Sequence, residues 1–231
     1  VSPQGDSLLV SWGLFNLCHH RSHENPEPLI PNQKIQVEFP LRACAHRLLP
    51  DHRWRLSLST SCFPHAWPSP KLVELQVHPG NNTFLTLPVR ENNHIPTPRF
   101  EPAESSIPLD NKILSQGTRN RVVSRDASNG KTVLEDHNHS GRVLFQESGL
   151  EMEDKASDRL EITKDHPLSM ITECRRTASI GRGDWQTRIE TKSRMTSDEM
   201  NFYLENHLEA YENDHVVFQK SWKTSVPRSF V

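Results

Sequence analysis

The 231-residue chain contains few cysteines, and they form no recognisable pair. The four are Cys18, Cys44, Cys62 and Cys174, and no Cys-x-x-Cys motif occurs. A chain of this length buries enough core to fold without covalent links. We therefore expect buried free thiols rather than a disulfide.

Long apolar runs are also missing. The longest, such as 8–10 and 216–218, fall far short of the roughly 20 residues that cross a bilayer. The chain begins Val-Ser-Pro-Gln-Gly-Asp, which has neither the charged nor the apolar region of a signal peptide. We expect no membrane partner, and a cytoplasmic location is favoured.

An excess of charge of one sign is the third absence. The chain carries 27 basic and 29 acidic residues, for a formal net charge of −2. Such a balance creates no field that would attract a phosphate backbone. Nucleic-acid binding is therefore excluded as a function, and no cofactor is expected.

The stretch from Arg53 to Pro70 is the most informative one present. Residues 53–59 alternate large apolar and polar side chains at period two, which predicts a half-buried strand with Trp54 in the core. The strand then reaches Phe63-Pro64 and Trp67-Pro68, where proline prevents further ladder bonding. We expect a rigid aromatic corner here.

Other segments of residues 1–90 repeat the same signals. Alternation at 34–39, 73–77 and 84–87 is separated by clusters such as Pro-Asn, Pro-Asp and Pro-Gly-Asn-Asn, which favour turns. The pattern is typical of an antiparallel β-sandwich. Residues 91–115 are rich in proline and lack periodicity, so they read as a connector whose Ile95, Phe100, Ile107 and Leu109 anchor it to the sandwich surface.

Residues 116–231 predict a second antiparallel β region. A hairpin is indicated at 121–135 by Ser128-Asn129-Gly130, and the Arg182-Gly183-Asp184 tripeptide is best interpreted as another tight turn. Trp185, Thr187 and Ile189 share one face of their strand, which indicates a broad sheet with one solvated side. The expected strands are 121–124, 132–135, 142–146, 159–163, 169–178, 185–194, 200–211 and 216–222.

Residues 197–211 fit two patterns. Met200, Leu204, Leu208 and Tyr211 recur at helical spacing behind a Ser197 cap. The even spacing of a strand is also met, by Phe202, Leu204, Leu208 and Ala210. Propensity alone favours a helix.

Several short motifs, taken in their order and spacing, carry a family resemblance. They resemble the C-terminal non-catalytic domain of the X-prolyl dipeptidyl-peptidases and the CocE/NonD acyl hydrolases. The motifs are Val10-Ser11-Trp12-Gly13, Asn16-Leu17, Pro26-Glu27-Pro28-Leu29, Ala45-His46-Arg47, Asp51-His52-Arg53-Trp54-Arg55-Leu56, the 59–64 corner, Gly141-Arg142, Gly183-Asp184-Trp185, Ser221-Trp222 and Val226-Pro227-Arg228.

The resemblance implies an all-β fold: an antiparallel, jelly-roll-like and galactose-binding-like sandwich, extended by a second antiparallel sheet. It favours a strand at 197–211. The family's jelly roll begins before the segment that matches residues 1–17, so we expect part of the sandwich to lie upstream or on another polypeptide, with an exposed edge here.

The resemblance also implies that catalysis lies elsewhere. A nucleophile elbow needs Gly-x-Ser-x-Gly, and this chain has none. The expected partner is an upstream α/β-hydrolase domain of the same protein, which this region supports and whose substrate cleft it helps to shape. The alternative is a jelly-roll module that binds carbohydrate or another ligand. We predict no catalytic, cofactor or metal residue, and Phe63 and Trp67 as a domain-contact or ligand surface.

Two polar clusters have the residue types of functional sites. Cys18-His19-His20 with His23 and Glu24 has metal-binding residue types, but adjacent strand residues point to opposite faces. Asp136, His137, His139 and Ser140 have the residue types of a catalytic triad, but triad members normally come from distant parts of a chain. A polar loop and a polar turn are the better interpretations.

Overall fold

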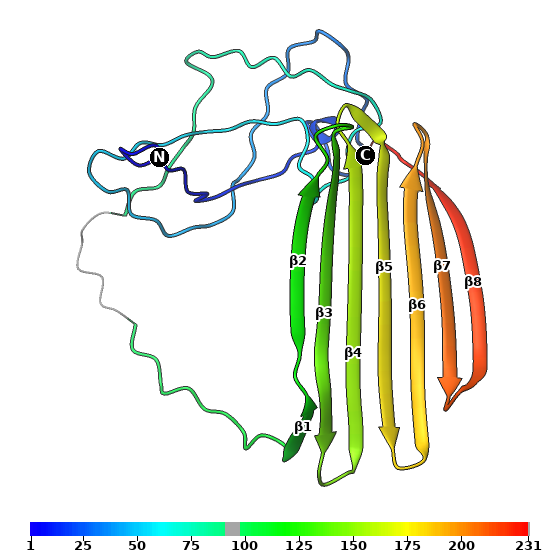
Figure 1. The fold of residues 1–231 in the computed structure, drawn as a ribbon. Coiled ribbons are helices and arrows are strands. Elements are labelled where there is room, and N and C mark those ends of the chain that lie inside the picture. The colour runs from blue at the N-terminus through cyan, green and yellow to red at the C-terminus, as the bar shows by residue number, and fades with distance from the viewer. Residues whose placement is uncertain (91–97, 231) are drawn as a thin grey trace.

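One eight-stranded antiparallel sheet dominates the computed structural model, which describes residues 1–90 and 98–230 (Figure 1). Strands β3 to β8 follow one another in chain order across the sheet, and β1 and β2 both pair with the outer edge of β3. The strands are β1 Asn111–Ser115, β2 Thr118–Arg125, β3 Lys131–Phe145, β4 Leu150–Thr163, β5 His166–Arg182, β6 Trp185–Ser197, β7 Asn201–Glu212 and β8 His215–Pro227. The predicted all-β antiparallel class is confirmed.

Short turns explain why the strands form a meander. The Asn129-Gly130 turn joins β2 to β3 and Gly183-Asp184 joins β5 to β6, as predicted, and both glycines have positive φ, at 71° and 57°. Only residues that tolerate positive φ close such tight hairpins without strain. Each strand therefore pairs with a neighbour that is close in sequence.

Strand β3 differs from the prediction of two separate strands at 132–135 and 142–146. It runs unbroken through both, because an irregularity between His139 and Arg142 absorbs the intervening residues. Gly141 has a φ of 83° at this point. The bulge keeps the ladder continuous while shifting the register.

The ambiguous segment at 197–211 is mostly strand. β7 pairs with β6 and β8 along its length, so the prediction of a strand is confirmed. Phe202, Leu204 and Leu208 share one sheet face at even spacing, and pairing on both sides outweighs intrinsic helix propensity.

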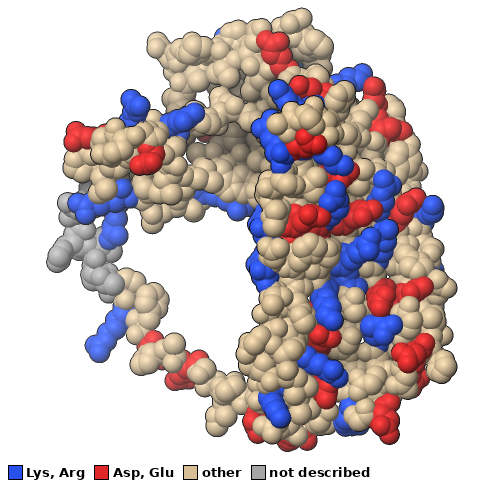
Figure 2. Space-filling view, viewed as in Figure 1, with Lys and Arg blue, Asp and Glu red and all other residues tan. Residues whose placement is uncertain are grey.

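The two faces of the sheet differ in chemistry. Residues paired across an antiparallel ladder lie on the same face, so the register assigns Leu134, Leu160 and Met195 to one side, with Met170 also on it. The other side is charged: Arg159 donates to Glu135 and Glu161 at 2.7 and 2.8 Å, and both signs are interspersed over the sheet in Figure 2. This is the solvated side that the alternation predicts.

Residues 1–90 contain no strand, and their one regular element is the 3-10 helix η1, Leu17–His19. The strands predicted at 34–39, 53–59, 73–77 and 84–87 are therefore wrong for this structure, and Trp54 is 45% exposed rather than in a core. Alternation makes a segment amphipathic, but a strand also needs a ladder partner for its backbone groups. This half gathers near one end of the sheet (Figure 1).

The predicted connector is described only in part. Ile95 lies outside the described residues, and Phe100, Ile107 and Leu109 are exposed, so these three do not anchor the segment as predicted. β1 starts at Asn111, inside the range predicted for the connector. The division at 1–90, 91–115 and 116–231 remains a prediction.

Buried side chains are few among the described residues. Leu134 and Met170 are the buried apolar residues, and Arg228 is the buried charged one. The four cysteines are free thiols, but none is fully buried, which corrects that part of the prediction. Burial raises the pKa of Cys174 to about 11, so this thiol is a poor nucleophile. No helix in the described part of the chain is long and apolar enough to cross a membrane.

Candidate functional site

The aromatic corner predicted from sequence packs against the end of the sheet. Residues 62–66 form a tight turn in which the backbone N–H groups of His65 and Ala66 both donate to the Cys62 carbonyl, at 2.7 and 3.0 Å. Prolines at 64, 68 and 70 deny the rest of the segment a regular ladder. We call residues 62–70 the corner.

Trp67 carries the aromatic contact between the corner and the sheet. Its indole Nε1 donates a 3.0 Å hydrogen bond to Ser197 Oγ, at the end of β6. Its ring meets Phe202 of β7 edge-to-face, with centroids 5.6 Å apart and an interplanar angle of 88°. A half-buried indole thus has both its apolar and its polar part satisfied.

Arg228, near the other end of the chain, also bonds the corner to the end of the sheet. It is 4% exposed, and its guanidinium donates to the Pro68 carbonyl at 2.6 Å and to the Asp198 carbonyl at 3.2 Å. It also donates to Ser197 Oγ at 3.3 Å and lies 4.8 Å from the Phe202 ring centroid. Burial lowers the pKa of Arg228 from its usual value, with Asp198 acting in the opposite direction. Arginine nevertheless stays protonated in proteins.

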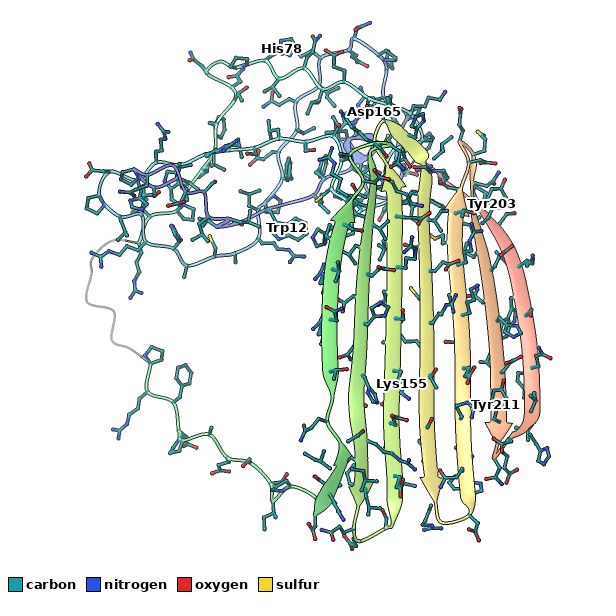
Figure 3. All side chains as sticks on the ribbon, in the orientation of Figure 1. Trp12, His78, Lys155, Asp165, Tyr203 and Tyr211 are labelled. Atoms are coloured by element: carbon teal, nitrogen blue, oxygen red, sulfur yellow. The ribbon has the colours of Figure 1, made fainter. Side chains whose placement is uncertain are left out.

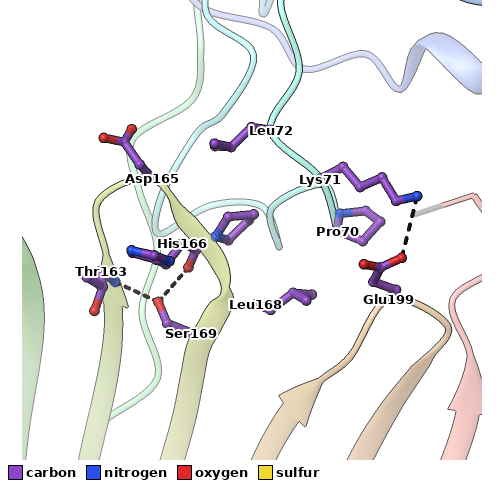
Figure 4. A pocket seen from close by; sticks show the side chains of 10 residues that line it. Pro70, Lys71, Leu72, Thr163, Asp165, His166, Leu168, Ser169 and Glu199 are labelled. Carbon is purple, nitrogen blue, oxygen red and sulfur yellow. Dashed lines mark hydrogen bonds and ion pairs between the residues drawn. The ribbon is translucent and has the colours of Figure 1, made fainter.

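A pocket of about 650 Å³ opens where the corner meets the β4–β5 and β6–β7 turns (Figure 4). Lys71 and Glu199 form an ion pair of 3.5 Å along its rim. Its lining residues are Pro70, Lys71, Leu72, Thr163, Asp165, His166, Pro167, Leu168, Ser169 and Glu199. The pocket therefore combines an apolar wall with charges of both signs.

The one serine in this pocket is not set up as a nucleophile. Ser169 Oγ donates to the His166 carbonyl at 2.6 Å and accepts from the Thr163 N–H at 2.8 Å. A serine nucleophile instead needs its hydroxyl bonded to a base. The hydrogen bonds of Ser169 therefore offer no route to covalent catalysis in this pocket.

A second constellation has the residue types of a catalytic triad. On the charged face, Ser221 Oγ lies 2.8 Å from His207 Nδ1, and His207 Nε2 lies 3.2 Å from Glu209 Oε1. The Tyr211 hydroxyl also donates to Glu209, and this bond, with the one from His207, lowers the pKa of the carboxyl.

The surroundings of that constellation do not suit acyl transfer. Acyl transfer needs N–H groups aimed at an oxyanion beside the nucleophile. Here β7 is paired on both sides, with β6 and β8, and Ser221 lies on β8, the exposed edge strand of the sheet. We interpret these three residues as a cross-strand polar group.

The polar clusters at 18–24 and 136–140 do not form sites. Asp136 binds Arg119 at 3.1 Å on one face of the sheet, whereas His139 contacts Glu153 at 2.6 Å on the other. His19 and His23 lie 3.3 Å apart through their Nδ1 atoms, but no group of three metal-ligating residues occurs in the described ranges. Phe63 is half-buried in the corner.

Sequence reasoning singled out Trp67 but did not connect it with its partners. Ser197 and Arg228 lie 130 residues and more away along the chain. The sequence signal for Arg228 is the Val226-Pro227-Arg228 motif, which carries the family resemblance but does not reveal the contact with Pro68. Sequence separation hides a contact of this kind.

The described residues form one antiparallel sheet with the corner packed against its end. A family model described as the X-Pro dipeptidyl-peptidase C-terminal non-catalytic domain matches residues 1–123. That match covers more than half of the chain, which therefore belongs to this family and has an accessory role in a peptidase. A search of curated proteins and a search of solved structures each returned no match.

Proposed function

We propose that this chain is the non-catalytic C-terminal region of a serine hydrolase of the X-prolyl dipeptidyl-peptidase or CocE/NonD type. Its partner is an α/β-hydrolase domain of the same protein, located upstream of Val1. The chain supports that domain and helps to shape its substrate cleft. The family match over residues 1–123 carries the proposal.

Two features of the chain support the proposal. The matched region contains extended amphipathic segments with exposed apolar side chains, such as Leu56 and Leu75, at 58% and 44% exposed. An adjoining domain would bury this surface. The corner packs against the end of the sheet through Trp67 and Arg228, which joins residues 1–90 to the strands.

The test begins with the coding sequence upstream of Val1. We expect it to encode, in the same frame, an α/β-hydrolase domain with a Gly-x-Ser-x-Gly elbow. In the longer protein, a fluorophosphonate probe should label the elbow serine alone, and deletion of residues 1–231 should lower the temperature at which activity is lost. A separate start codon at this chain, or labelling within residues 1–231, would contradict the proposal.

The pocket beside the corner favours a second candidate function, ligand binding. Its volume of about 650 Å³ lies within the range of known small-molecule sites. A titration with mono- and disaccharides, followed by tryptophan fluorescence, tests this candidate. Under the leading proposal the wild-type signal stays flat; a saturable change that Lys71→Ala weakens would favour the ligand-binding module instead.

A further inference from the structure

The apolar face of the sheet is not covered by a second layer of strands. Among the described strands, each contacts only its neighbours in the ladder. Large apolar side chains on this face remain accessible, with Ile189 at 47% and Phe218 at 51% exposed. Exposed apolar area of this extent marks an interaction surface rather than ordinary solvated surface.

The register divides this face into three zones. An upper apolar zone holds Leu134, Leu160, Met195 and Leu204, and the corner already reaches it where Trp67 meets Phe202. A polar belt follows across the middle of the strands and contains Asp136, Asp158, Arg176 and Asn206. The lower apolar zone contains Val143, Met152, Ile180, Ile189, Ala210 and Phe218.

Most of the charges in the belt are paired within the chain. Lys220, also in the belt, lies over the Trp222 ring, and Asp154 adds a carboxylate to the rows of the lower zone. Arg176 binds Asp158 at 2.7 Å, and Arg119 binds Asp136 at 3.1 Å. Asn206, on β7, adds an amide with both a donor and an acceptor to the same belt. Charges that are already paired resist burial less than isolated ones do.

The size of the free surface suits a stable association. Strands such as β6 and β8 have 13 residues each. At about 3.4 Å per residue and about 4.8 Å between strands, the belt and lower zone together span roughly 25 Å by 30 Å. That footprint, roughly 750 Å², approaches the ~800 Å² that each partner buries in a standard interface.

We infer that a second copy of this chain covers the belt and the lower apolar zone, so that two sheets pack face to face. A two-fold interface requires a surface that is its own complement. A two-fold axis parallel to the strands brings together residues at the same position along the strand direction. The belt of one copy then meets the belt of the other, and the lower apolar zone meets its counterpart. The result is an aligned β-sandwich built from two chains. This inference is independent of the proposed function.

The test measures the mass of the 231-residue chain in solution. Light scattering after size exclusion, and sedimentation over a dilution series, should give twice 26.6 kDa at micromolar concentration, with dissociation on dilution. Ile189→Glu and Phe218→Glu each place a charge in the lower zone and should weaken dimerisation at least about tenfold. Lys192→Glu is the matched control, because Lys192 is exposed on the charged face of β6, and it should leave the dimer intact.

Other outcomes would identify a different occupant and overturn the inference. If the wild-type chain stays monomeric at about 100 micromolar, the inference is wrong and another domain covers the face. A dimer that survives Ile189→Glu would place the contact elsewhere, as in pairing through the edge of β8. Far-UV circular dichroism of each variant verifies that the sheet is retained, and the dilution series on wild-type protein tests the inference even if a variant misfolds.

Discussion

Trp67 and Ser197 are separated by 130 residues in the chain, yet the indole Nε1 of Trp67 donates a 3.0 Å hydrogen bond to Ser197 Oγ. Ser197 Oγ also accepts from Arg228 at 3.3 Å, so one hydroxyl joins three distant parts of the sequence. This junction joins residues 1–90 to the end of the sheet at which Figure 3 labels Tyr203.

Trp67→Phe should destabilise the junction. The change keeps most of the ring contact with Phe202 and removes the indole N–H, so Ser197 loses one donor. We expect a loss of about 1 kcal/mol in the free energy of unfolding. Urea titration followed by circular dichroism measures it. Trp185→Phe, at a 48% exposed residue of β6, is the control and should change the midpoint less; equal midpoints for Trp67→Phe and wild type would show that the bond contributes nothing.

Arg228→Lys should be almost as damaging as Arg228→Ala. The guanidinium serves the Pro68 and Asp198 carbonyls and Ser197 Oγ together, and an ammonium cannot match that planar geometry. Each acceptor left unpaired costs about 1–3 kcal/mol, so a loss of about 3 kcal/mol is expected. Thermal unfolding provides the measurement.

Arg175→Ala is the control for Arg228, because Arg175 is exposed on the charged face of β5. It should change the free energy of unfolding by about 0.5 kcal/mol or less. If Arg228→Lys proved as stable as wild type, the hydrogen-bond geometry described for the junction would be incorrect.

Stability at the junction should fall in acid because of Asp198. The Tyr203 hydroxyl and the Met200 and Asn201 N–H groups donate to its carboxylate and lower its pKa in the folded state. A lowered folded pKa stabilises the protein above the unfolded pKa of about 4, and that contribution is lost as pH falls through the folded pKa.

The pH dependence is measured as the urea midpoint between about pH 2 and 7, a range that brackets carboxylate titration. Asp198→Asn should flatten the acid side of the curve relative to wild type. Asp214→Asn, in the β7–β8 turn, is the matched carboxylate control. An acid limb of unchanged steepness in Asp198→Asn would assign the acid sensitivity to other groups.

Gly141→Ala should disrupt the bulge in β3. Gly141 has a φ of 83°, and an added Cβ would press on the Ser115 carbonyl and lie 2.8 Å from Gly117 N. Both the backbone strain and the clash are unfavourable, so we expect a loss of at least about 2 kcal/mol. Gly183→Ala also has positive φ but meets nothing within 4 Å, so it should cost only about 1 kcal/mol. Similar melting temperatures for the two variants would refute a steric role for the bulge.

The sheet was predictable where sequence signals agreed at short range. Asn129-Gly130 and Gly183-Asp184 marked turns between alternating segments, and each resulting strand found its partner next along the chain. The segments around Trp54 and Leu75 alternate equally well, but they form no strand here. Alternation therefore predicted which side chains share a face, and it predicted a strand only where a nearby partner was available.

The sequence alone determined the antiparallel β class and the meander of the second half of the chain. It also determined the family that the chain resembles. These follow from local periodicity and turn chemistry, which act over a few residues. Tertiary structure alone decided that Trp67 meets Ser197, that Arg228 is buried beneath the corner, and that one face of the sheet stays uncovered. Contacts between residues more than 100 positions apart depend on how the whole chain folds, and no local pattern encodes them.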